Sequence, residues 1–132
     1  MMDIRGLAYV VAETTDLARW RTYAEGVLGM STTPSPDGGL YLRMDERQFR
    51  FAIQPGLRDA YVASGWEVLG QAGFDAALAT LQGAGVEFVL EDAAFCARRC
   101  VQQAASFRDP SGNRHEVVWG FQSDFERFNS PA

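Results

Sequence analysis

The sequence predicts an α+β fold in which two βαβββ modules form one pseudo-twofold curved-sheet cup. The first observation is that the order strand, helix and three strands is predicted twice along the 132 residues. The second is that Gly29 and Gly85 are separated by the same interval as Val10 and Trp66, so the two halves keep register. Two ordinary α+β segments could match by coincidence, but one half alone would leave an apolar sheet face exposed.

The first module is expected at about residues 4–54. Apolar residues at helical spacing between Leu17 and Leu28 predict a helix, and Gly29 is suited to end it in the left-handed conformation. The last strand of this module alternates apolar and polar side chains, which indicates one buried face. Three of the four strands of this module are located, at 4–11, 40–44 and 48–54, and a turn-rich loop is expected at 33–39.

The second module is expected at about residues 59–120. Gly85 can close its predicted helix, whose apolar residues share one face. Residues 91–99 are ambiguous between a loop and a helical turn, and they make the second half longer than the first. The apolar face of the helix consists of Phe74, Leu78 and Leu81. The expected strands are 61–69, 86–90, 101–108 and 114–119, with a tight turn at 109–112.

The composition is that of one globular domain, predicted at residues 1–120 and followed by a tail at 121–132. Hydrophobic residues make up 47% of the chain, and the formal net charge is -5. This acidic balance disfavours nucleic acid as a partner, because phosphates would repel it. No apolar run is long enough for a membrane helix, and no signal pattern begins the sequence, so a cytoplasmic protein is expected.

Cys96 and Cys100 stand close together, and His115 is the single histidine. The functional interpretation is a redox pair or half of a metal site, but a metal site needs more ligands. A disulfide at this spacing would be awkward on a helix. Two reduced thiols are the simpler interpretation.

Motifs spread over the chain resemble a known family. The opening at 7–17 and the hairpin motif F-x-D-P-x-G-x-x-x-E at 107–116 are similar to the first module and the last hairpin of the vicinal oxygen chelate superfamily. Further motifs narrow the resemblance to the N-terminal domain of two-domain type I extradiol dioxygenases, the group that includes 2,3-dihydroxybiphenyl 1,2-dioxygenase. These motifs are Trp20-Arg21, Met44-Asp45, 50–53, 65–68 and 97–99.

The resemblance implies where the family's metal ligands map on this chain. Extradiol enzymes hold Fe(II) with two histidines and one glutamate, and they leave positions open for the catechol and dioxygen. The histidine positions match Tyr9 and a residue at or near Ala63, and the glutamate position matches Glu116. Neither a catalytic residue nor a metal site is therefore expected in this chain. Glu116 is either a relic or a partner for Arg114 or another base.

His115 is a tempting ligand because it precedes Glu116. Consecutive strand residues point to opposite faces, so His115 faces away from the cup if Glu116 faces into it. A histidine on the outer face of the sheet is the simpler interpretation.

The tail carries Phe121, Phe125 and Phe128 at i, i+4 and i+7, which predicts an aromatic stripe on a helical turn. Such a stripe would pack on a C-terminal catalytic domain or on a second copy of the chain. The alternative is that it folds back on its own sheet. Residues 129–132 are expected to form a linker.

Three functions follow as hypotheses. The resemblance implies the non-catalytic N-terminal domain of a two-domain Fe(II) extradiol dioxygenase, with the iron and most contacts to an aromatic substrate in the C-terminal domain. The alternative is a stand-alone dimeric small-molecule-binding module of the bleomycin-resistance type, whose cleft would be lined by aromatic residues. An independent metalloenzyme of the glyoxalase or epimerase type is disfavoured, because the sequence has one histidine.

Overall fold

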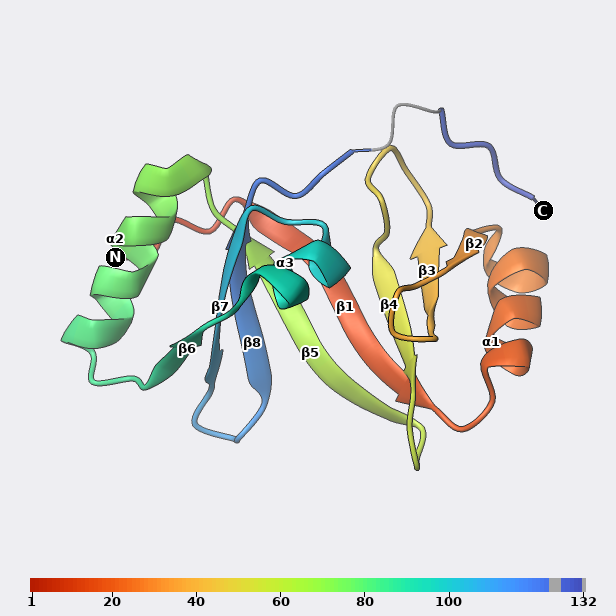
Figure 1. Ribbon diagram of the computed structural model, residues 1–132, viewed down its shortest axis with the longest axis horizontal. Coiled ribbons are helices and arrows are strands. Elements are labelled where there is room, and N and C mark those ends of the chain that lie inside the picture. Colours follow the sequence, from red (N-terminus) through yellow and green to blue (C-terminus); the bar gives the residue numbers. More distant parts are fainter. Residues whose placement is uncertain (124–126, 132) are drawn as a thin grey trace. The chain divides into compact units, whose positions relative to one another are not determined.

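The computed structural model describes residues 1–123 and 127–131. Its helices and strands confirm the α+β class (Figure 1). The chain divides into two compact units, each with a strand, a helical segment and three strands in the predicted order, and the second unit has one further short helix. We call them the α1 unit, Tyr9–Val62 with Gln122–Ala132, and the α2 unit, Met1–Ala8 with Ala63–Phe121.

The α1 unit contains four strands in the order β2, β3, β4 and β1. β1 and β4 are parallel, and the other neighbours are antiparallel. The strands are β1 (Gly6–Thr14), β2 (Ser31–Pro34), β3 (Leu40–Arg43) and β4 (Phe51–Pro55). β2 corrects the prediction that a loop begins at 33, because Thr32 and Thr33 pair with β3.

The predicted first helix forms in two parts. Helix α1 (Leu17–Tyr23) begins at Asp16, whose side chain accepts the Arg19 N–H at 3.0 Å. The π-helix η1 (Ala24–Leu28) follows and ends at Gly29, which adopts the predicted left-handed conformation with φ 70°.

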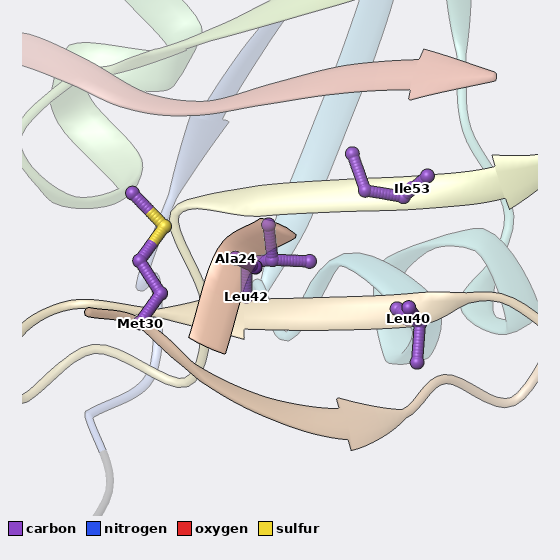
Figure 2. Close-up of a cluster of buried hydrophobic side chains, with 5 residues drawn as sticks. All are labelled: Ala24, Met30, Leu40, Leu42 and Ile53. Atoms are coloured by element: carbon purple, nitrogen blue, oxygen red, sulfur yellow. The ribbon is translucent and has the colours of Figure 1, made fainter. Parts of the chain in front are cut away.

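The wider π turn changes which side chains the segment buries. Ala24 is fully buried, whereas Val27 and Leu28 are 67% and 44% exposed, although the sequence placed them on the apolar face. The extra residue of a π turn rotates the side chains that follow it about the helix axis. Ala24 packs with four buried side chains (Figure 2): Met30, which precedes β2, Leu40 and Leu42 of β3, and Ile53 of β4.

The α2 unit contains four strands in the order β5, β8, β7 and β6. β5 and β8 are parallel, and the other neighbours are antiparallel. Helix α2 (Gly70–Gly83) packs on them through Phe74 and Ala77, which contact Val68, Ala105 and Val117. The strands are β5 (Ala60–Glu67), β6 (Phe88–Leu90), β7 (Gln103–Arg108) and β8 (Arg114–Trp119).

The ambiguous segment at 91–99 contains a helix, α3 (Ala93–Arg99). Asp92 caps it by accepting the Phe95 N–H at 2.8 Å. Cys100 ends the helix in the left-handed conformation with φ 57°, a backbone geometry that usually requires glycine.

The described part of the tail is extended and not helical. Phe121 is buried in the α2 unit. Beyond it, Gln122 accepts the Gln48 N–H at 3.2 Å, and the Phe128 N–H reaches the Glu46 carboxylate at 3.1 Å. The predicted helical stripe is therefore not found at Phe121 or Phe128, because the backbone here pairs with the turn after β3, and Phe125 lies outside the described residues. Within the described residues, no helix is long and apolar enough to cross a membrane.

Candidate functional site

Glu116 is the centre of the candidate site. It lies in the middle of β8, with Gly65 of β5 opposite on one side and Ser106 of β7 on the other. Its side chain is completely buried. A buried carboxylate needs charged or hydrogen-bonding partners, since removing it from water is costly.

Arg99 supplies the first of these partners. It is the last residue of α3, and only 8% of its side chain is exposed. Its Nε donates to Glu116 Oε1 at 2.9 Å, and its Nη2 donates to Glu116 Oε2 at 3.4 Å. This two-point contact is the planar fork geometry that arginine forms with carboxylates.

Arg114 supplies the second partner, because residues two apart on a strand share a face. Its Nε donates to Glu116 Oε2 at 3.1 Å, and its Nη2 lies 3.5 Å from Glu91 Oε1. Ser106 donates its hydroxyl to the same Glu91 oxygen at 2.7 Å. The result is a partly buried chain of alternating charge that balances two carboxylates against two guanidinium groups. We call Glu91, Arg99, Arg114 and Glu116 the charge network.

Phe95 of α3 holds the guanidinium groups of this network from one side. Its ring centroid lies 4.6 Å from Arg99 Cζ and 5.7 Å from Arg114 Cζ. Cations are attracted to the face of an aromatic ring, and the attraction is stronger where water is excluded. The ring therefore limits the movement of both guanidinium groups, and their N–H groups remain directed at carboxylates.

The other two positions implied by the resemblance carry no metal-binding group of the expected kind. Ala63 is buried on β5 opposite Arg114, and its methyl group has no donor atom. Tyr9 belongs to the α1 unit, where its ring packs 5.3 Å from that of Phe49. Phe49 in turn stacks on Tyr41 at 4.5 Å. We call Tyr9, Tyr41 and Phe49 the aromatic cluster.

These residues do not fit Fe(II). Both oxygens of Glu116 already accept from arginine donors, so this carboxylate is neutralised without a metal ion. In the described ranges, 1–123 and 127–131, no group of three or more His, Cys, Asp or Glu side chains is placed to hold a metal ion. In the same ranges, every buried polar side-chain atom has a hydrogen-bond partner.

His115 lies on the other face of the sheet, as strand alternation predicts. Its ring stacks on Phe107, whose side chain packs on the α2 core. Trp66 Nε1 donates to His115 Nδ1 at 2.9 Å, and Asp109 Oδ2 lies 2.9 Å from His115 Nε2. Because an indole N–H can only donate, His115 Nδ1 accepts the hydrogen bond from Trp66. Nε2 therefore carries the ring proton and donates a hydrogen bond to Asp109 Oδ2.

Asp109 organises the turn between β7 and β8. The hydrogen bond from His115, followed by that from the Asn113 backbone N–H, lowers the pKa of Asp109 to about 2. Its Oδ1 accepts the N–H groups of Ser111 and Asn113, each at 2.9 Å. Asp109 and His115 thus stabilise the predicted turn, which contains Gly112 at φ 85°.

Cys96 and Cys100 are not joined by a disulfide. Burial raises the pKa of the Cys96 thiol, and the negative charges of Asp92 and Glu91 raise it further. A thiol with a raised pKa is a poor nucleophile and a poor metal ligand, because both roles need the thiolate.

The sequence located Glu116 and named Arg114 as a possible partner, and the structure confirms that pair. It did not assign roles to Arg99, Phe95 or Glu91. The segment at 91–99, which makes the second half longer than the first, could have pointed to them, because all three residues lie on it.

Comparison with known proteins shows which proteins the chain is similar to. Residues 7–56 match the family model of Dihydroxybiphenyl dioxygenase BphC D1. An iron-dependent extradiol dioxygenase of Rhodococcus jostii (strain RHA1) is 40% identical over 98% of this chain, which covers 44% of that relative. A biphenyl-2,3-diol 1,2-dioxygenase of Paraburkholderia xenovorans (strain LB400) is 33% identical over 96% of this chain and 42% of its own length.

Solved structures give the same result. A crystal structure of a catechol 2,3-dioxygenase superposes on the whole chain with a TM-score of 0.92 and 31% sequence identity, and the chain covers 45% of it. In sequence and fold the chain resembles the vicinal oxygen chelate family. Within that family it is similar to the N-terminal domain of type I extradiol dioxygenases. It spans less than half the length of each of these relatives.

Proposed function

We propose that this chain is the non-catalytic N-terminal domain of a two-domain Fe(II) extradiol dioxygenase that cleaves catechol-type aromatic rings. One observation carries the proposal. The chain aligns over nearly its whole length with relatives named as dioxygenases, but it covers 44% or less of two of them and lacks a ligand set that fits iron. That last statement concerns the described residues. The iron and the reacting ring belong to the remaining part of such a protein.

The proposed role of this domain is structural. It would pack on the catalytic domain, help to close the substrate channel and supply oligomer surface, while the chain alone would be inactive. Tyr9, Ala63 and Glu116 are proposed as the former ligand positions, and residues 1–120 as the domain that residues 121–132 connect onward. The substrate is proposed as a catechol, since relatives are named for 3-methylcatechol and biphenyl-2,3-diol. A cytoplasmic location stays a prediction.

The first test is the mass of the native polypeptide in its source cells, detected with an antibody against this chain. A band at slightly more than twice 14.6 kDa is expected from the share of each relative that the chain covers. A band at 14.6 kDa would overturn the proposal and favour a stand-alone binding module, which a stable dimer with a deep groove would then support.

The second test uses the native protein in an oxygen-uptake assay with a catechol substrate. Activity is expected to disappear when a chelator removes Fe(II) and to return when Fe(II) is added back. Glu116→Gln is expected to leave the iron content unchanged, because this side chain binds arginines rather than metal. Loss of one iron per chain from a Glu116→Gln protein that circular dichroism shows to be folded would place the metal in this domain and contradict the proposal.

A further inference from the structure

We propose that Arg99 is a built-in cation at Glu116 and takes the place that a divalent metal would occupy, so that this domain contains an internal guanidinium site. The inference rests on the proposed function in one respect, the assignment of Glu116 to a former ligand position. The ligand class is specific. The site takes a planar, delocalised cation with a fork of N–H donors, and not a spherical metal ion.

Burial shows that Glu116 requires a cation. Its side chain has no exposed area, and an isolated carboxylate in such a place would be protonated or would destabilise the fold. Arg114 alone supplies one short contact, to Oε2, and it also faces Glu91. Arg99 contacts both oxygens and is itself almost fully buried.

Geometry shows why the cation is a guanidinium. Arg99 makes its two contacts while its Cζ lies 4.6 Å from the centroid of the Phe95 ring. A planar cation can satisfy a carboxylate at its edge and an aromatic ring at its face at the same time. An ammonium group or a hydrated metal ion lacks this planar fork of donors.

The residues of this site that do not lie on β8 come from one segment of the chain. Helix α3 and the residue before its cap supply Phe95, Arg99 and Glu91, the members of the site that do not lie on β8. In the α1 unit, no helix stands between the second and third strands of the module in the described residues, where α3 stands in the α2 unit. The extra segment of the second half therefore brings the cation, the ring beside it and the acid that holds Arg114.

Chemical rescue tests the inference. Arg99→Ala leaves a guanidinium-shaped space beside the buried Glu116, so free guanidinium should bind there. We expect this substitution to lower the thermal midpoint, and millimolar guanidinium chloride to restore most of the loss with a saturable dose response. These concentrations lie far below the molar range in which guanidinium denatures proteins. Urea, the neutral planar analogue, and potassium chloride at equal ionic strength should restore nothing.

Two matched variants make the result specific. Arg98→Ala removes a neighbouring arginine that also lies near Phe95, at 5.6 Å, and guanidinium should not raise its midpoint. Arg99→Ala combined with Glu116→Gln removes the anion as well, and its response to guanidinium should disappear. An equal response in all three variants, or none in Arg99→Ala, would overturn the inference.

A second measurement covers the case in which Arg99→Ala does not fold. Arg99→Lys keeps the charge but loses the fork, and its midpoint should lie well below that of the unchanged protein. An unchanged midpoint in Arg99→Lys would show that any cation suffices and would refute the guanidinium assignment. None of these readouts involves ring cleavage, so failure here is distinguishable from failure of the proposed function.

Discussion

The two units have the same order of elements but bury different chemistry. In the α1 unit, Tyr9 belongs to the aromatic cluster, whose neighbouring ring centroids lie 5.3 Å and 4.5 Å apart. In the α2 unit, Glu116 belongs to the charge network, which is supported by Phe95. Each pair of packed aromatic rings contributes separately to the stability of the fold. A buried charge network depends on every member, because losing one leaves another charge without compensation. The two units thus fill their interiors differently, around Tyr9 in one and around Glu116 in the other.

The largest expected effect is the loss of Glu116. Glu116→Gln should destabilise the protein by about 3–5 kcal/mol, because it leaves Arg99 buried without its counter-charge. Urea titration at neutral pH measures the change. The matched variant is Glu116→Gln with Arg99→Met, which should recover at least about 2 kcal/mol of that loss. Strictly additive effects of the two substitutions would show that the residues do not act as a pair.

A smaller effect is expected in the aromatic cluster. Phe49→Leu should cost about 1–2 kcal/mol, since it keeps an apolar side chain but removes both ring contacts of Phe49. The matched control is Leu57→Ala at a fully exposed position of the same unit, which should stay within about 0.5 kcal/mol. If Phe49→Leu proved as costly as Glu116→Gln, the proposed difference between the two units would fail.

The helix ends provide a third comparison. Cys100 and Gly29 both occupy left-handed positions, with φ 57° and 70°. Cys100→Gly should therefore stabilise the protein by about 1 kcal/mol, and Gly29→Ala should destabilise it by a similar amount, as measured by urea midpoints. A loss of stability in Cys100→Gly would mean that the contacts of the cysteine side chain outweigh its backbone strain.

The sequence predicted the architecture better than the site, and the reason is physical. Gly29 and Gly85 end their helical segments in the expected conformation, because the backbone requirement is local. The π turn that exposes Val27 could not be predicted, since it depends on how Ala24 packs against distant strands. The identity of Glu116 followed from a motif. Its pairing with Arg99 is a contact between a helix and a strand and has no local signature.

The smallest expected effect concerns the turn at Asp109. Its pKa in the folded protein is about 2, below the ordinary value of 3.8, because His115 and the Asn113 N–H stabilise the charged form. Asp109 therefore contributes stability above pH 3.8 and loses that contribution as the pH falls through about 2. A thermal-midpoint series across this window should show the loss, and Asp109→Asn should flatten that part of the curve. Asp59, whose pKa is lowered mainly by the Thr15 N–H, is the matched site in the α1 unit, and Asp59→Asn should leave the Asp109 step in place. If Asp109→Asn left the curve unchanged between these pH values, the contacts of His115 and Asn113 with this carboxylate would not be coupled to folding.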